Sequence, residues 1–414
     1  MTAVTSASIS PNRTANITEY ILKRSSELEN ELVEVRRWLH QHAELSWKEY
    51  ETTDYIAGYL ENLGLTVHRY DGHTGCWAMI EGGNDTESGK TILLRADIDA
   101  LPIQEETGLP YSSEHPGVFH GCGHETHAAM LLIACKMLVE IKEELPGKVK
   151  ILFQAAEETA CGAKYYVDQG ILDGVDAVYG CHISSWLDEP IIAVNPGPRC
   201  ASTDEFSIEI QGEGCHGGMP HQGKDALVAA CAVVTNLQTI VSRQTDPIDT
   251  LVITVGKLES GTNYNVVADK ASMSGTVRTY SQEVREGVEE KMRQVAENVS
   301  KALGCTATVN YIMKTGPVIH SDPLMCKLAH DAVIKLFGEQ SAVATRPVGG
   351  GDDFAYFSEK VPGIYAFIGA AIPSADGKVH AHHHPKVCFS EAALKRGVAM
   401  HVQMAVDFLN TSVL

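Results

Sequence analysis

The sequence predicts an α/β protein with two domains, and three observations support this prediction. A chain of 414 residues is longer than one ordinary hydrophobic core requires, so two domains are expected. In the first half, apolar segments of strand length alternate with segments of helical periodicity, which indicates a mostly parallel sheet. The middle of the chain has a different order of elements, which indicates an inserted second domain.

The first half of the chain is predicted to place polar residues at the ends of buried strands. Residues 17–63 have helical periodicity, and the predicted strands that follow are 66–70, 76–81, 91–99, 148–155 and 177–180. The last three strands end in Asp97 and Asp99, in Glu157 and Glu158, and in Cys181 and His182. Because sites in such sheets form beyond the carboxyl ends of the strands, these side chains are expected to lie close together.

The middle segment has the β-α-β-β-α-β order of a ferredoxin-like domain. Its predicted strands are 206–211, 251–258, 271–280 and 306–314, and its predicted helices are 225–243 and 281–303. The α/β pattern then resumes with helix 322–337, strand 363–369 and helix 390–409. We therefore expect a discontinuous domain of residues 17–196 and 315–414, and an inserted domain of residues 197–314.

Composition excludes some classes of partner and favours a compartment. The net charge of −20 opposes binding to nucleic acid, which needs a basic face. No apolar run is long enough to predict a membrane span, and residues 1–16 are expected to form a loose tail, not a signal peptide. The 11 scattered cysteines favour reduced thiols in the cytoplasm over a disulfide framework.

A short motif carries the strongest chemical signal. Residues 121–127, Gly-Cys-Gly-His-Glu-Thr-His, contain a thiol, two imidazoles and a carboxylate, and residues 128–141 continue as an apolar helix. Cys122 and His124 are one residue apart in a loop, so both can contact one cation. Thiolate and neutral imidazole are good ligands for a metal such as zinc. Taken alone, the motif also fits a tight turn with an ordinary buried cysteine.

Further candidate ligands follow later in the chain and favour the metal interpretation. They are Glu158, His182 and one histidine of the cluster His382, His383 and His384. Five ligands exceed what one tetrahedral ion uses, so we expect two metal ions that share a bridge. Glu157 would then be the general acid/base of a hydrolytic reaction. The alternative for Glu157 and Glu158 is a solvated pair at a helix start.

Other polar residues are weaker candidates. Asp97 is expected to orient a ligating histidine, while Asp99 could be a ligand or a supporting group, and Arg95 could pair with either. His216 lies in a glycine-rich turn that could reach over the metals to stabilise an oxyanion, or could be a surface loop. Asn265 and Arg278 could bind a substrate carboxylate, or could simply be solvated.

In combination, the motifs resemble a known family. The matching segments are 36–40 with 44–46, 95–102, 121–124, 154–158, 181–182, 216–221, Asn265 with 275–278, 353–354, and 383–385. The chain resembles the aminoacylase/carboxypeptidase-type family of two-metal metallohydrolases, and within it the amidohydrolase subfamily of hippurate, N-acyl-amino-acid and indole-acetyl-amino-acid hydrolases. Glu125 and Thr126 stand where this subfamily usually has Asp and Gly.

The resemblance implies a fold, a site and an activity. It implies a zinc-peptidase-like α/β catalytic domain with an inserted ferredoxin-like lid, which often forms a homodimer interface. The implied metal ligands are Cys122, His124, Glu158, His182 and His383, with Glu157 as general acid/base and His216, Asn265 and Arg278 as substrate contacts. The histidine two residues before proline is the family ligand, which selects His383.

The expected activity is hydrolysis of the amide bond of N-acyl amino acids with two divalent ions, Zn²⁺ or Mn²⁺, in each subunit of a homo-oligomer. One alternative is a dipeptidase or aminopeptidase that uses the same metals. A second alternative is a ligand-binding relative without catalysis, and the presence of both Glu157 and the full ligand set argues against it.

Overall fold

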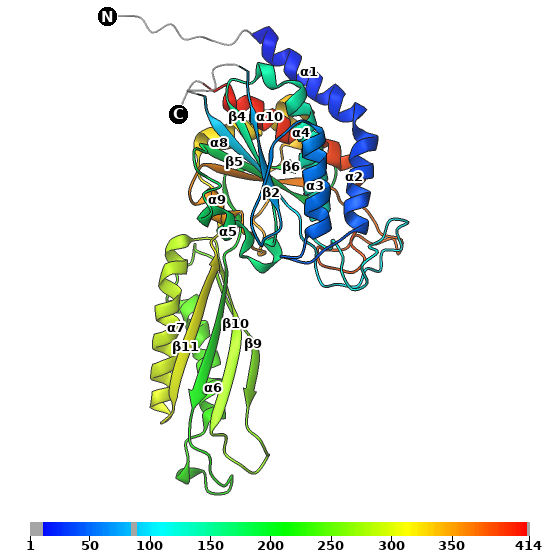
Figure 1. The fold of residues 1–414 in the computed structure, drawn as a ribbon. Helices are drawn as coiled ribbons and strands as arrows, with labels where there is room; N and C mark the ends of the chain where they lie inside the picture. Colours follow the sequence, from blue (N-terminus) through cyan, green and yellow to red (C-terminus); the bar gives the residue numbers. More distant parts are fainter. Residues whose placement is uncertain (1–10, 84–88, 412–414) are drawn as a thin grey trace, which may run out of the picture. The chain divides into compact units, whose positions relative to one another are not determined.

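The computed structural model describes residues 11–83 and 89–411. The first ten residues of the expected tail lie outside the described residues, and helix α1 begins at Pro11. The chain divides into two compact units (Figure 1). The first unit comprises Met1–Gly197, His320–Thr345 and Tyr356–Leu414, and the second comprises Pro198–Ile319 and Arg346–Ala355.

Two segments, residues 315–319 and Arg346–Ala355, belong to the second unit, although residues 315–414 were expected to return to the first domain. The longer of the two is Arg346–Ala355. The reason for its place in the second unit is backbone pairing: the Val348 N–H donates to the Arg199 carbonyl at 2.9 Å, and the Ala201 N–H donates to the Gly350 carbonyl at 2.9 Å. These bonds attach the glycine-rich loop to the first residues of the second unit.

The first unit is built on a mixed sheet. Its described strands are β1 (Val67–Arg69), β2 (Cys76–Glu81), β3 (Thr91–Asp97), β4 (Lys148–Gln154), β5 (Ala177–Ser184), β6 (Ile192–Ala193) and β13 (Gly363–Gly369), in the order β1-β2-β4-β3-β5-β13-β6. The central strands β4, β3, β5 and β13 are parallel, whereas β1, β2 and β6 pair antiparallel at the edges. The sheet is therefore parallel in its centre, as predicted, and antiparallel at its edges, which the sequence did not indicate.

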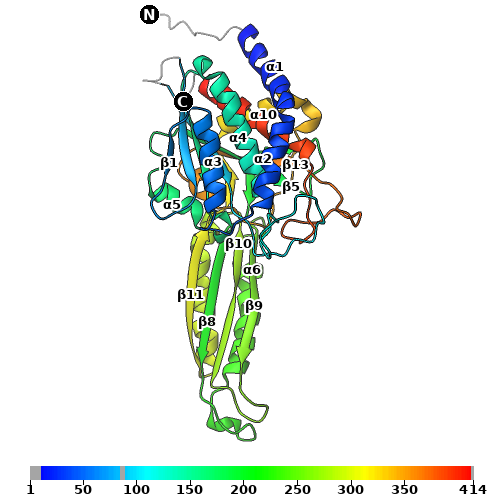
Figure 2. The same ribbon diagram turned by 45° about the vertical axis from the view of Figure 1, so that its right-hand side comes forward.

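The helices of the first unit pack on this sheet or on one another. They are α1 (Pro11–Glu27), α2 (Glu29–Gln41), α3 (Tyr50–Asn62), α4 (His124–Glu140), α5 (Gly162–Asp168), α8 (Pro323–Phe337), α9 (Ala355–Ser358) and α10 (Leu394–Leu409). Helices α4 and α10 contact each other and both contact β3 and β5, so they cover the same face of the sheet (Figures 1 and 2). Both helices are buried over most of their length, which places the apolar run after the ligand motif in the core. The predicted α/β fold class is confirmed.

The second unit has the predicted ferredoxin-like order. Its elements are β7 (Gly197–Cys200), β8 (Thr203–Gln211), α6 (Ala226–Arg243), β9 (Leu251–Ser260), β10 (Lys270–Thr279), α7 (Gln282–Ala302), β11 (Thr306–Thr315) and β12 (Val318–His320). The four long strands form an antiparallel sheet in the order β11-β8-β10-β9, and β7 pairs with β12. Figure 2 shows α6 and α7 packed on one face of the four-stranded sheet.

Helix α6 alone, among the helices of the described residues, has the length and apolar composition of a membrane span. Its mean hydropathy over 18 residues is 1.4, and a third of that window is buried. The buried side chains Ala229, Val233, Leu237 and Ile240 recur at helical spacing and belong to the core of the second unit. The apolar composition of α6 is thus partly explained by its packing on its own sheet.

Candidate metal centre

The ligand-bearing loop ends where helix α4 begins, and a glycine makes this junction possible. Gly123 is the N-cap residue of α4 and has φ 89°, a left-handed conformation that other residues rarely adopt. A Cβ atom at this position would lie 2.5 Å from Cγ2 of Ile183 and 2.9 Å from Cε2 of Phe389. Glycine therefore allows the chain to place Cys122 and His124 on either side of a tight, buried turn.

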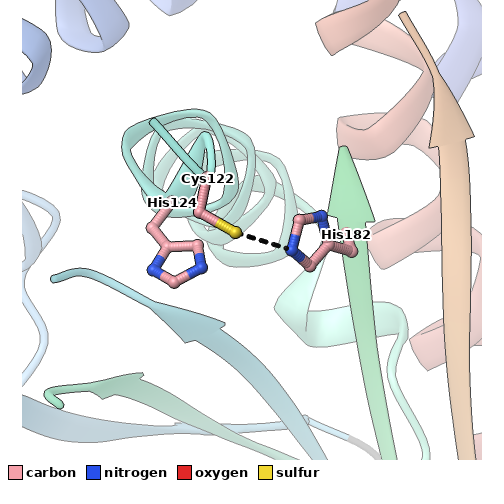
Figure 3. Close-up of side chains that lie close together, drawn as sticks. All are labelled: Cys122, His124 and His182. Carbon is pink, nitrogen blue, oxygen red and sulfur yellow. Dashed lines mark hydrogen bonds between the residues drawn. The ribbon is translucent and has the colours of Figure 1, made fainter. Parts of the chain in front are cut away.

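Three of the predicted ligands form one cluster. Figure 3 shows Cys122 from the loop, His124 from the start of α4 and His182 from β5 with their side chains close together. The Cys122 Sγ atom lies 3.4 Å from Nε2 of His182. One ligand atom from each of these three side chains lies within 4.8 Å of the other two, a separation that one metal ion can bridge.

The remaining predicted ligands extend this cluster within the same unit. Ligand atoms of Cys122, Glu158 and His383 also lie within 4.8 Å of one another, as do those of His124, Glu157 and Glu158. Nε2 of His383 lies 3.6 Å from Oε1 of Glu158. The structure thus brings all five predicted ligands together, with the predicted general base beside them. Their role as metal ligands stays a prediction.

Two buried polar atoms of the cluster fit a bound cation. Nδ1 of His124 lies 3.0 Å from the Asp99 carbonyl oxygen and 3.1 Å from Asp99 Oδ1, and this contact orients the ring. Nε2 of His124 lies 3.9 Å from Oε2 of Glu157 and 4.0 Å from Oε1 of Glu158. In the part of the chain that the structure describes, neither His124 Nε2 nor Glu158 Oε1 has a hydrogen-bond partner. Buried polar atoms without partners are uncommon, and a bound ion would satisfy both.

The surroundings of the cluster shift the pKa values of its side chains. Burial raises the pKa of the Cys122 thiol and of the Glu158 carboxyl, because the charged forms are removed from water. Burial also lowers the pKa of His182, which keeps its imidazole neutral. Burial alone would lower the pKa of His124, but the Asp97 carboxylate, the Cys122 side chain and the Asp99 carboxylate together outweigh burial and raise this pKa. The donor types, one thiol, three imidazoles and one carboxyl, fit a divalent metal ion, which binds their deprotonated forms. Metal binding would therefore release the protons that the raised pKa values favour on Cys122 and Glu158.

Asp97 supports the site through His127, which was not among the predicted site residues. Its Oδ2 accepts a hydrogen bond from Nη1 of Arg95 at 2.5 Å, and its Oδ1 lies 2.5 Å from Nδ1 of His127. Nε2 of His127 accepts the backbone N–H of Ile183 at 2.8 Å, directly after His182. Asp97 therefore positions β5 through His127. The only sequence signal for His127 is its place one helical turn after His124.

Asp99, which the sequence left between two roles, contacts two parts of the cluster. Its Oδ1 lies 3.1 Å from Nδ1 of His124, and its Oδ2 accepts the backbone N–H of Glu158 at 3.0 Å and the Ser46 hydroxyl at 2.6 Å. Neither oxygen of Asp99 belongs to the clusters of ligand atoms, so this geometry favours the supporting role.

The structure distinguishes the two adjacent histidines near the C-terminus. Nδ1 of His382 lies 3.2 Å from the Cys122 carbonyl oxygen, and its Nε2 accepts the Ser185 N–H at 3.2 Å. Both ring nitrogens of His382 thus contact the backbone beside other ligands. His383 has φ 67° and directs its ring to Glu158. The geometry supports the selection of His383 that the resemblance implied.

Glu125, which departs from the usual subfamily pattern, has buried partners. Its Oε1 accepts hydrogen bonds from Nη2 and Nε of Arg36 at 3.0 and 3.2 Å, and lies 2.9 Å from Nδ1 of His40. All three side chains are buried. Arg36 and His40 come from α2, so Glu125 attaches the first turn of α4 to α2. The longer side chain at this position is therefore explained by an ion pair inside the core.

The predicted substrate contacts lie in the second unit, at two different places. The Gly217 N–H donates to the Asn265 carbonyl at 2.8 Å, and His216 pairs with Val266, so His216 and Asn265 are neighbours. Arg278 lies near the other end of β10, where its Nη1 is 3.5 Å from the Ser202 carbonyl. Arg278 lies eight positions along the extended strand from Lys270, where β10 begins, which corresponds to roughly 26 Å.

Comparison with known proteins identifies relatives over nearly the whole chain. The chain is 40% identical over 369 residues to an N-acetyl-L-cysteine deacetylase of Bacillus subtilis, covering 89% of this chain and 86% of the relative. It is 36% identical over 388 residues to thermostable carboxypeptidase 1 of Saccharolobus solfataricus, covering 93% and 97%. A crystal structure of a dinuclear metal-binding peptidase of the M20 family from Bacillus subtilis superposes with a TM-score of 0.82 at 34% identity, covering 93% and 99%.

Residues 93–407 match the peptidase family M20/M25/M40, a range that contains every predicted ligand and the predicted general base. The family resemblance drawn from the sequence motifs is thereby confirmed. The chain is a hydrolase of amide bonds that belongs to the peptidase family M20/M25/M40.

Proposed function

We propose that this protein is a metal-dependent amidohydrolase that releases a carboxylic acid and an amino acid from an N-acyl amino acid. The observation that carries the proposal is the convergence of Cys122, His124, Glu158, His182 and His383 beside Glu157. The relative named N-acetyl-L-cysteine deacetylase supports an N-acyl amino acid as the substrate class.

The five converging side chains are assigned as ligands of two divalent cations, Zn²⁺ or Mn²⁺. The overlap of their clusters at Cys122, His124 and Glu158 supports two adjacent positions better than one. When bound, such a pair of cations supplies Lewis-acid activation of the amide carbonyl and of the attacking water. The crystal structure of the related dinuclear metal-binding peptidase supports the same number of ions.

Glu157 is assigned as general base and general acid. It is nearly buried, and its carboxylate lies beside His124 Nε2. Glu157 takes one proton from the attacking water as the new C–O bond forms at the amide carbon. It returns that proton to the amine nitrogen as the C–N bond breaks, so the amine leaves as a neutral group.

Three residues of the second unit are assigned to substrate binding: His216, Asn265 and Arg278. Arg278 offers a guanidinium fork that suits a substrate carboxylate. Because Arg278 and Asn265 lie near opposite ends of β10, they cannot contact one small substrate within a single chain. The assignment therefore requires a homo-oligomer, in which His216 and Asn265 of one copy act at the site of another.

A complementation experiment tests this assignment. We expect Glu157→Gln and His216→Ala homodimers each to be nearly inactive. Heterodimers that combine the two chains should regain one competent site, because His216 of the first chain would serve Glu157 of the second. If His216 acts only within its own chain, the heterodimers will stay as inactive as the parents.

The activity itself is tested with defined metals and substrates. N-acetyl and N-benzoyl amino acids should be hydrolysed after addition of Zn²⁺ or Mn²⁺, and a chelator should abolish turnover. Metal-replete Glu157→Gln should retain its metal and lose several orders of magnitude in kcat. A wild-type rate in that variant would contradict the assignment of the base.

A second candidate is peptide hydrolysis on the same metals, which the relative named thermostable carboxypeptidase 1 supports. Dipeptides and N-blocked dipeptides in the same assay distinguish the two activities by their kcat/KM ratios. All 11 cysteines are thiols in the structure, which supports a reducing compartment such as the cytoplasm. Fractionation of cells that express the tagged protein tests the compartment.

A further inference from the structure

The two neighbouring carboxylates Glu157 and Glu158 project from an unusual turn. Glu157–Thr159 form a single 3₁₀ turn after β4, and the turn is flanked by two alanines in the left-handed conformation. Ala156 has φ 59° and ψ 39°, and Ala160 has φ 57° and ψ 29°. Each such residue costs roughly 1–2 kcal/mol relative to a right-handed conformation. The surrounding structure must therefore hold this turn in place.

A buried glutamate from a distant part of the sequence contacts the start of this turn. Oε1 of Glu49 accepts the backbone N–H of Ala156 at 2.9 Å, and its Oε2 accepts a short hydrogen bond from the Thr74 hydroxyl. The side chain of Glu49 is fully buried. On the other side of the turn, Oδ2 of Asp99 accepts the N–H of Glu158 at 3.0 Å. Two buried carboxylates thus hold two amide groups that flank Glu157.

The environment of Glu49 is closely packed. The Tyr166 hydroxyl accepts the Ala155 N–H at 3.1 Å and donates to the Thr74 carbonyl at 2.6 Å. A Cβ atom at Gly162 would lie 1.9 Å from the Ala155 carbonyl oxygen. Tyr166 and Gly162 therefore restrain the backbone directly before the turn, next to the amide that Glu49 holds.

The Glu49 side chain does not cap its own helix. Glu49 is the N-cap residue of α3, but its side chain makes no capping hydrogen bond. Glu44 does this instead, because its carboxylate accepts the N–H groups of Glu51 at 3.2 Å and Thr52 at 2.9 Å. The Glu49 carboxylate is directed away from its own helix and toward the turn at Ala156.

We propose that Glu49 is a positioning residue for the hydrolytic reaction, which fixes the turn that carries Glu157 and Glu158 by holding the Ala156 amide. The proposal rests on the proposed function, in which Glu157 moves the proton and Glu158 binds metal. Misplacement of catalytic groups by about 1 Å can lower a rate about 100-fold, so loss of this contact affects turnover more than substrate binding.

The test compares three variants at saturating metal. Glu49→Ala removes the contact and should lower kcat about 10- to 100-fold with KM changed less than about threefold. Glu49→Gln should stay within about threefold of the wild-type kcat, because the amide oxygen can accept the Ala156 N–H and the amide nitrogen can donate to Thr74. Glu44→Ala is the matched control, since it loosens the start of α3 without touching the turn, and its kcat should be unchanged.

Hydrogen exchange of the metal-free proteins gives a readout that does not depend on activity. The peptide that contains Ala156 should exchange faster in Glu49→Ala than in the wild type, and at the wild-type rate in Glu49→Gln and Glu44→Ala. If Glu49→Ala does not fold, Thr74→Val, which removes the second partner of the carboxylate, should show the same two changes in weaker form.

Three results would overturn the proposal. The first is a wild-type kcat together with a wild-type exchange rate in Glu49→Ala, or in Thr74→Val if Glu49→Ala does not fold. The second is a loss of kcat in Glu44→Ala equal to that in Glu49→Ala. The third is a loss of kcat in Glu49→Gln as large as that in Glu49→Ala. An error in the proposed function gives a different pattern, because Glu157→Gln would then keep its activity while the exchange differences at Ala156 remained.

Discussion

Glu49 also makes the stability of the first unit depend on pH. Burial, and then the neighbouring Asp99 charge, raise the pKa of Glu49 from 4.5 to about 7. An acid whose pKa is higher in the folded state holds its proton more tightly there than in the unfolded chain. The folded state therefore loses stability as the pH rises from about 4.5 to about 7. The difference between the two pKa values lowers the free energy of unfolding by about 3 kcal/mol once the pH is above 7.

Replacement of Glu49 by glutamine should remove this cost. Glutamine has nearly the same shape, keeps both hydrogen bonds and does not ionise. We expect Glu49→Gln to increase the free energy of unfolding by about 1 kcal/mol at pH 5 and by about 3 kcal/mol at pH 8. The variant thus separates the charge of Glu49, which costs stability, from its hydrogen bonds, which position the turn.

Denaturant unfolding of the metal-free proteins measures this difference. All 4 tryptophans, Trp38, Trp47, Trp77 and Trp186, lie in the first unit, so their fluorescence reports on the unit that contains Glu49. Unfolding curves of the wild type and the variant at pH 5, 6, 7 and 8 give the gain at each pH. If Glu49→Gln increased the free energy of unfolding equally at pH 5 and pH 8, or decreased it at pH 8, the reasoning would be refuted.

Three other predictions concern the metal site, the substrate and the core. Cys122→Ser should weaken metal binding by at least about 10-fold in a competition titration, because a hydroxyl is a poorer ligand than a thiolate. Unchanged metal affinity and stoichiometry in this variant would show that Cys122 is not a ligand. Arg278→Ala should raise KM more for substrates with a carboxylate than for their amides, and equal effects on both would contradict a carboxylate contact. Arg36→Ala should lower the free energy of unfolding by about 3–5 kcal/mol, because it leaves the Glu125 charge buried without its cation. A loss below about 1 kcal/mol in tryptophan-detected unfolding would show that this ion pair contributes little.

The variant Glu49→Gln tests the stability prediction and the activity prediction together. If glutamine stabilises the fold at pH 8 and keeps kcat, then the carboxylate charge at this position has no role in the hydrolysis that we propose. If glutamine stabilises the fold but lowers kcat, the negative charge beside the turn contributes to turnover, and the positioning role of Glu49 is wrong as stated.

The sequence alone was sufficient to predict the architecture, because hydrophobic periodicity and strand order are local properties of the chain. The alternation of strands and helices, the inserted β-α-β-β-α-β segment and the polar ends of β3, β4 and β5 were all visible in it. Four ligand candidates could also be found from residue type and position, because Cys122 and His124 form a short motif and Glu158 and His182 follow predicted strands. The fifth, His383, was selected from three neighbouring histidines only by the family resemblance. The sequence did not indicate the antiparallel edges of the sheet, since strand direction at an edge depends on pairing.

The sequence suggested Asp97 and Asp99 as supporting residues, but only the tertiary structure showed their partners and the other supporting contacts. The contacts of Glu49 with Ala156, of His127 with Asp97 and of His382 with the Cys122 carbonyl join segments between 30 and 260 residues apart in the chain. The separation of Asn265 from Arg278 likewise follows from the length of β10 and its pairing. Hydrogen bonds act over about 3 Å, and local sequence does not specify which distant segments come that close.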